Sequence, residues 1–266
     1  MTTLRCKCPR ADLRGRTVMA MQLGWALAGA AAGLLAGAGM RTVVVRLSVP
    51  RDAPERTDCA GCGRPFSAAG GWRGRLWPLA GGRCPHCRLR VGPPAATLEL
   101  ATGALLALVA TTVGGRAELL AFGWLAVVGV ALAAVDLAVH RLPNRLVLPG
   151  YPVVLGALTL AAIVGGDPAR LLRAVAGCLA VGCGYLVLVL LRPGQLGLGD
   201  LKLSGLLGLA LGWLGWPAVL RGTFLAFALL SVCGLALLAA RRVRLGSPLP
   251  FGPFMLAGAL LALLAY

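Results

Sequence analysis

The stretch that decides the fold is FGWLAVVGVALAAVDLAVHRLPN, residues 122–144, in which a long apolar run ends in an aspartate and a Leu-Pro-Asn turn. The whole chain has 58% hydrophobic and 13% charged residues, a composition that excludes an ordinary soluble domain. Apolar runs near the roughly 20 residues needed to cross a bilayer recur along it. We therefore expect an all-α polytopic membrane protein with about eight transmembrane helices. The expected helices cover residues 18–39, 97–113, 117–139, 146–165, 170–191, 203–219, 222–240 and 249–266.

Basic residues give the chain a formal net charge of +17 and lie mostly in the loops between the apolar runs. Because they do not gather in one groove-sized domain, they do not indicate nucleic-acid binding. Positive loops tend to face the cytoplasm. This rule places the loops that hold Arg141, Lys202 and Arg241, and the basic segment 41–96, on the cytoplasmic side.

The amino-terminal residues conflict with this topology. A single first helix at 17–40 would place the basic tail of residues 1–16 on the outside, against the same rule. We expect translation to start at Met19 or Met21, which would remove the tail. The first helix then serves as an uncleaved anchor, since no small-residue cleavage site follows it convincingly.

Segment 41–96 is the part of the chain that is long and polar enough to fold outside the membrane. It contains Cys59-Ala-Gly-Cys62 and Cys84-Pro-His-Cys87, two CxxC pairs separated by 21 residues. This spacing predicts a structural zinc ribbon, because two knuckles together supply four thiolates at the corners of a tetrahedron. The alternative is a pair of disulfides, which rarely persist in the reducing cytoplasm.

Carboxylates are scarce in the apolar part of the chain. After Glu118 the acidic residues are Asp136, Asp167 and Asp200, and Asp167 lies in a Gly-Gly-Asp-Pro turn. An ionisable residue at membrane depth costs about 2.5 kcal/mol or more on insertion scales, so it indicates a function with a partner nearby. We expect Asp136 and Asp200, both near the cytoplasmic ends of helices, to be each other's partner.

Two carboxylates at one site share a proton, so that one can act as acid while the other acts as base. This is the pair that an aspartic protease uses to activate water against a peptide carbonyl. The alternative is that each aspartate only caps a helix. A cap at a helix amino terminus suits Asp200, whereas the dipole at a carboxyl terminus disfavours Asp136.

The order of these motifs resembles the type IV prepilin peptidase family over nearly the whole chain. The matching elements are the CxxC pairs, Asp-x(5)-Leu-Pro-Asn ending at Asn144, Gly-Leu-Gly-Asp-Leu-Lys-Leu at 197–203 and Pro-Phe-Gly-Pro-Phe at 250–254. The resemblance implies an inner-membrane GxGD aspartic endopeptidase of bacteria that removes the basic leader from type IV prepilins and pseudopilins. It assigns the catalytic roles to Asp136 and Asp200. Residues 97–266 would form a seven-helix peptidase domain.

The same resemblance supplies further expectations about the site. Residues that shape it would be Pro143, Asn144, Gly197, Gly199, Lys202, Pro250 and Gly252. Many family members also methylate the new amino terminus with S-adenosylmethionine. Arg41 stands here where the family has an asparagine, and this departure counts against methylation.

Two other functions are compatible with the residues. Asp136 and Asp200 could bind a cation in a transporter, although both are expected at one membrane face and not at the midplane. The chain could also be a zinc-stabilised scaffold of a secretion apparatus without chemistry of its own. Replacement of the aspartates separates these functions from the peptidase.

Overall fold

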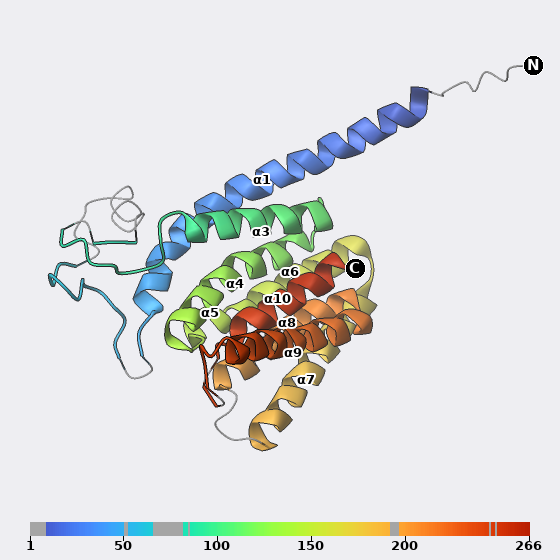
Figure 1. Ribbon diagram of the computed structural model, residues 1–266. Helices are drawn as coiled ribbons and strands as arrows, with labels where there is room; N and C mark the ends of the chain where they lie inside the picture. Colours follow the sequence, from blue (N-terminus) through green and yellow to red (C-terminus); the bar gives the residue numbers. More distant parts are fainter. Residues whose placement is uncertain are drawn as a thin grey trace, which may run out of the picture.

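A computed structural model describes residues 9–50, 53–65, 82–84, 86–191, 197–244, 246–247 and 249–266 (Figure 1). These residues are organised as helices, and their extended pairing is limited to two isolated bridges in the cysteine segment. The helices are α1 (Pro9–Leu47), α3 (Thr97–Val113), α4 (Leu119–Val139), α5 (Asn144–Val147), α6 (Gly150–Gly165), α7 (Pro168–Leu191), α8 (Leu198–Leu214), α9 (Trp216–Ala239) and α10 (Gly252–Leu264). The all-helical prediction is confirmed for the described chain.

Five described segments are long and apolar enough to cross a membrane, which makes this a multi-pass membrane protein. They are Thr17–Leu47, Leu119–Val139, Asn144–Gly165, Pro168–Leu191 and Trp216–Ala239. The apolar helices α3 and α10 are shorter, and the 17 residues of α8 include Asp200 and Lys202 near its start. The expectation of eight transmembrane helices is therefore not confirmed.

The first helix differs from its predicted bounds at both ends. It begins at Pro9 and continues to Leu47, so Arg41 belongs to the helix and not to a loop. Residues 1–8 of the expected basic tail lie outside the described residues. In Figure 1 the amino-terminal part of α1 extends beyond the other helices, and its carboxyl-terminal part packs beside α3.

The break between α8 and α9 also differs from the predicted one. The two helices are separated at Gly215, whereas the apolar pattern placed the break near residues 220–221. Gly215 has a φ of 136°, a conformation that favours glycine, and Pro217 follows in the first turn of α9. Backbone geometry, which hydropathy does not record, therefore sets this boundary.

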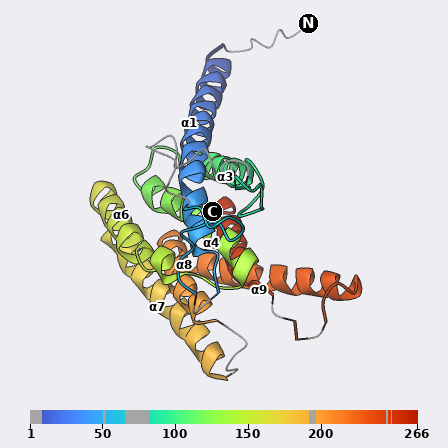
Figure 2. The ribbon, with the colours of Figure 1, turned by 90° about the vertical axis from the view of Figure 1, so that its left-hand side faces the viewer.

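Helix α8 is the central helix of the bundle. Each of its residues from Leu203 to Leu214 is buried, and the helix contacts α5, α6, α7, α9 and α10. Figure 2 shows α7 and α9 as outer helices. The closest approach is to α7, where a Cβ added at Gly208 would lie 2.5 Å from the carbonyl oxygen of Gly177. Small residues at such contacts allow helices in a membrane to pack closely. Packing on all sides fixes the position of Asp200 at the start of α8.

Candidate functional site

Asp136 and Asp200 line one polar cavity with a volume of about 390 Å³. The cavity is formed where α4 ends, where the turn to α5 follows and where α8 begins. Its other lining residues are His140, Arg141, Leu142, Pro143, Asn144, Gly197, Leu198, Gly199 and Lys202. We call this part of the bundle the aspartate end.

Asp136 lies in the last turn of α4 and is only 4% exposed. Its Oδ2 accepts a hydrogen bond of 2.9 Å from the backbone N–H of Gly252, the first residue of α10. The first N–H groups of a helix have no partner within the helix, and its amino terminus favours negative charge. Asp136 is therefore stabilised by the amino terminus of α10, which offsets its unfavourable place at the end of α4.

Asp200 is the third residue of α8. Its Oδ2 accepts a hydrogen bond of 3.1 Å from the backbone N–H of Gly197, just before the helix. A carboxylate at this position stabilises the start of a helix, as in the second half of a capping box. The predicted cap at Asp200 is thus present, while the side chain also lines the cavity.

The two carboxylates are close enough to interact electrostatically, although Asp136 and Asp200 are 64 residues apart in the sequence. Both carboxylates are also held by backbone N–H groups, so neither depends on a flexible side chain for its orientation. The cavity that both carboxylates line is large enough to admit water.

Most of the other expected site residues line the cavity, and Gly252 and Pro250 do not. Pro143, Asn144, Gly197, Gly199 and Lys202 line the cavity, and the Nζ of Lys202 donates a hydrogen bond of 2.9 Å to Oδ1 of Asn144. Gly252 acts through its N–H group, as described above. Pro250 precedes α10 and is not among the described residues that line the cavity.

Two contributors to the site were not predicted. His140 ends α4 in the left-handed conformation and lines the cavity. Tyr185 of α7 is buried, interacts electrostatically with Asp200 and stacks on Phe227 and Phe251. Tyr185 stands in an unbroken apolar run, so the sequence gives no local indication that it lies near Asp200.

The four cysteines of the segment between α1 and α3 come together as predicted. Their Sγ atoms all lie within 4.8 Å of one another, with 3.5 Å between Cys59 and Cys87 and 3.7 Å between Cys62 and Cys84. A tetrahedral zinc ion with Zn–S bonds of about 2.3 Å requires S–S separations of about 3.8 Å. All four are free thiols, as zinc binding requires. The residues therefore fit a tetrahedral metal ion.

The two CxxC turns have the same backbone geometry. The N–H of Cys59 donates to the carbonyl of Arg64, and the N–H of Gly63 donates back to Cys59. In the second turn, the N–H of Cys84 donates to the carbonyl of Leu89, and the N–H of Arg88 donates to the carbonyl of Cys84. Backbone N–H groups of Cys87 and His86 lower the pKa of the Cys84 thiol to about 6, which favours the thiolate that binds metal.

The cysteine segment is attached to the aspartate end of the bundle. Arg141, in the turn after α4, donates a hydrogen bond of 2.7 Å to the carbonyl of Pro50. Arg145 of α5 forms an ion pair with Glu55. Figure 1 shows the segment on the same side of the bundle as the α4–α5 turn. The four-cysteine cluster and the aspartate cavity therefore belong to the same face of the protein.

Arg41 occupies a buried position between α1 and α3. It is 2% exposed, and its guanidinium forms hydrogen bonds of 2.8 Å and 2.5 Å to the two carboxylate oxygens of Glu99. The same group donates to the carbonyls of Pro93 and Pro94, where the cysteine segment ends. Arg41 thus joins α1, α3 and the end of the cysteine segment.

The fold and the site together define a multi-pass helical membrane protein with two carboxylates in one cavity and a four-cysteine cluster that could hold a metal ion on the same side. The sequence profile of the type IV leader peptidase family matches residues 119–239, from α4 to α9. This range contains Asp136 and Asp200 and excludes the cysteine segment and α10.

Several curated relatives carry the name prepilin leader peptidase/N-methyltransferase. The relative from Burkholderia pseudomallei is 36% identical over 214 residues, covering 80% of this chain and 66% of that protein. The relative from Aeromonas salmonicida is 32% identical over 221 residues, covering 82% and 72%. The chain spans slightly less than two thirds of the Burkholderia protein. The search of solved structures found no match. The chain belongs to the type IV leader peptidase family.

Proposed function

We propose that this protein is a membrane aspartic endopeptidase that removes the basic leader peptide from type IV prepilins or pseudopilins. The observation that carries the proposal is the meeting of Asp136 and Asp200 in one cavity at the ends of α4 and α8. Membership of the leader peptidase family and the names of its relatives support it.

In the proposed mechanism the two carboxylates hold one proton between them. The ionised aspartate takes a proton from water, and that water attacks the scissile carbonyl. The protonated aspartate donates a hydrogen bond to the carbonyl oxygen as negative charge develops on it. The C–N bond of the tetrahedral intermediate then breaks, and the leaving amine takes up the proton that the other aspartate received from water. The N–H groups of Gly197 and Gly252 keep the carboxylates oriented during these steps.

In the proposed orientation the protein spans a bacterial inner membrane. The aspartate end and the cysteine segment face the cytoplasm. Basic residues at this end, such as Arg141 and Arg145, agree with the positive-inside rule. We propose that Cys59, Cys62, Cys84 and Cys87 hold a structural zinc ion, which would stabilise a segment too small to form its own core. In this scheme residues 41–96 are the zinc segment, and residues 97–266 are the peptidase domain.

Methyl transfer to the new amino terminus is not included in this proposal. Relatives carry N-methyltransferase in their names, but Arg41 stands where the resemblance to the family implies an asparagine. The guanidinium of Arg41 is engaged by Glu99 and two carbonyls, so this position does not offer a free polar group to S-adenosylmethionine.

The test is co-expression with a candidate prepilin, with leader removal followed by mass spectrometry. Asp136→Asn and Asp200→Asn should each abolish cleavage while the protein accumulates normally. Asp167→Asn is the matched control, because this aspartate is 47% exposed and pairs with Arg170 away from the cavity. Cleavage that persists in either cavity variant would refute the proposed dyad and favour a transporter or a scaffold.

A further inference from the structure

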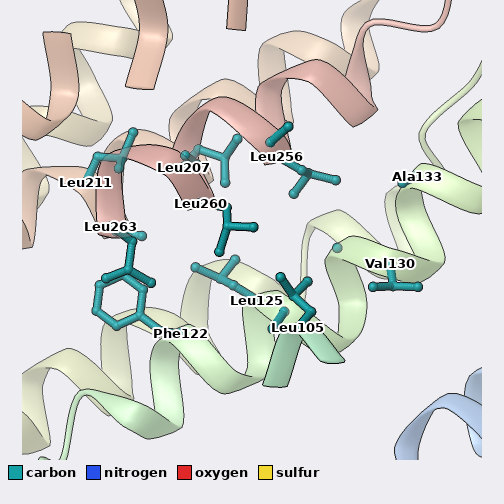
Figure 3. Close-up of a pocket in the computed structure, with 15 residues that line it drawn as sticks. Leu105, Phe122, Leu125, Val130, Ala133, Leu207, Leu211, Leu256, Leu260 and Leu263 are labelled. Atoms are coloured by element: carbon teal, nitrogen blue, oxygen red, sulfur yellow. The ribbon is translucent and has the colours of Figure 1, made fainter. Parts of the chain in front are cut away.

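The two helices that carry the aspartates, α4 and α8, have little direct packing with each other. Among the described helices, α8 packs on α5, α6, α7, α9 and α10, and its contact with α4 is slight. An apolar groove of about 210 Å³ lies between α4 and α8 and is also lined by α3 and α10. Figure 3 shows Leu207 and Leu211 of α8 on one side of this groove and Leu125 of α4 on the other. Direct packing of α4 on α8 therefore does not fix the separation of the two carboxylates.

Lys202, near the start of α8, is bound at two of its atoms by the chain that follows α4. Its Nζ donates a hydrogen bond of 2.9 Å to Oδ1 of Asn144, the first residue of α5. Its carbonyl oxygen accepts a hydrogen bond of 2.6 Å from the O–H of Tyr151, the second residue of α6. Lys202 follows Asp200 by two residues, and Asn144 follows Asp136 by eight. The two bonds therefore connect the start of α8 to the chain that leaves the end of α4.

The hydroxyl of Tyr151 is not needed to satisfy the backbone of α8. A carbonyl inside an α-helix accepts the N–H of the residue four positions later, which for Lys202 is Leu206. Tyr151 adds a second donor to this carbonyl, which has two lone pairs. Gly205 makes room for the hydroxyl, because an added Cβ would lie only 2.5 Å from its oxygen. The bond therefore holds the start of α8 against α6 and does not replace a missing helix bond.

We propose that Tyr151 is a positioning residue for Asp200. The inference rests on the proposed function and adds a residue that acts on the aspartate pair from outside the cavity. Tyr151 is not among the described residues that line the cavity, so it acts through the carbonyl of Lys202. This bond fixes where α8 begins relative to the α4–α5 turn, and so how far apart the two acids lie. Catalysis depends on this separation, because a misplacement of about 1 Å can cost about 100-fold in rate.

The first test is Tyr151→Phe in the full-length enzyme, with kcat and KM measured for leader removal from a prepilin. Loss of the hydroxyl should lower kcat about three- to tenfold, the effect of one neutral hydrogen bond expressed as a rate. KM should stay within about twofold, because the hydroxyl does not touch the substrate. The thermal unfolding midpoint should stay within about 4 °C, because the carbonyl keeps its partner within the helix. Tyr266→Phe is the matched control, since it removes the same atom from a tyrosine that is 58% exposed.

The second test is Gly205→Ala, alone and combined with Tyr151→Phe. Alone, the added methyl group displaces the hydroxyl, so kcat should fall as it does in Tyr151→Phe. In the combined variant the displaced oxygen is absent. The next atoms, Cζ of the residue 151 ring and Sγ of Cys178, would lie at ordinary contact distances of 3.5 Å and 3.7 Å. Adding Gly205→Ala to Tyr151→Phe should therefore cost less than about twofold more, a non-additivity that marks two changes acting on one bond.

The outcomes separate this inference from the proposed function. If the wild type does not cleave prepilin, the proposed function fails and the inference fails with it. If the wild type cleaves prepilin and Tyr151→Phe keeps the wild-type kcat, only the inference is overturned. A loss that appears in KM alone, or a large fall in the unfolding midpoint, also overturns it. The same holds if Gly205→Ala lowers kcat equally with and without the Tyr151 hydroxyl.

Discussion

Gly252→Ala is a severe test of the site, because it perturbs Asp136 without altering a carboxylate. A Cβ added at Gly252 would lie 2.9 Å from Oδ2 of Asp136 and 3.2 Å from Cδ2 of Leu142. Oδ2 is the atom that accepts the hydrogen bond of the Gly252 N–H group. The methyl group therefore forces the carboxylate to rotate away from its donor.

The size of the effect follows from the interaction that is lost. A hydrogen bond to a charged group contributes about 1.5–3 kcal/mol. If the oriented carboxylate is needed in the transition state, each 1.36 kcal/mol costs about tenfold in rate. We therefore expect kcat for leader removal to fall between about 10-fold and about 150-fold. The free energy of unfolding should fall by no more than about 3 kcal/mol, because the same hydrogen bond to a charged group contributes about 1.5–3 kcal/mol to stability.

The assay measures leader removal from a prepilin by purified enzyme in detergent or liposomes, together with the thermal unfolding midpoint. Gly156→Ala is the matched control, since a Cβ at this exposed position of α6 has no atom within 4 Å. Wild-type kcat in Gly252→Ala would refute the inference that the N–H group of α10 positions a catalytic Asp136. A loss of stability well beyond about 3 kcal/mol would show that the change acts on folding instead.

Three further changes test the metal centre and the packing. Cys59→Ser should remove most of the roughly one zinc ion per chain expected by elemental analysis, and unchanged zinc content would contradict the assigned ligands. Arg41→Met leaves Glu99 as an unpaired, largely buried charge and should lower the free energy of unfolding by about 3–5 kcal/mol. Adding Glu99→Leu should restore much of the lost stability. Wild-type stability in the single variant would refute the role of the pair. Gly208→Val places side-chain atoms against the backbone of α7 and should cost about 1–3 kcal/mol, measured by thermal unfolding. Gly184→Val, where a Cβ meets no atom within 4 Å, is its control, and equal loss in both variants would contradict the packing argument.

The sequence predicted the features that depend on composition and local spacing. The cysteines are an example, because a CxxC turn brings two sulfurs together by local backbone geometry alone. The scarcity of carboxylates was enough to select Asp136 and Asp200, since burial of charge is costly wherever the helices pack. Their catalytic role stays a prediction.

Features that depend on tertiary packing could not be predicted from local patterns. Gly252 was expected to shape the site, but its hydrogen bond to Asp136, 116 residues away, comes from a backbone N–H group, and local patterns do not show which carboxylate such a group will meet. Tyr185 is buried near Asp200 because α7 packs on α8, and an apolar run does not show which residue faces inward. The extension of α1 to Leu47 follows similarly from the packing of Val44 and Leu47 against α3 and α4.

The structure also changes the choice between a capping and a catalytic role for the aspartates. Each carboxylate accepts a hydrogen bond from an N–H group at or beside the start of a helix: Asp200 at α8 and Asp136 at α10. Such bonds stabilise a carboxylate in a site where charge is otherwise costly. They also fix its orientation, and a protease requires oriented carboxylates beside its substrate. Capping is therefore the physical means by which this bundle holds two acids in one cavity, and the two roles are compatible in the same residues.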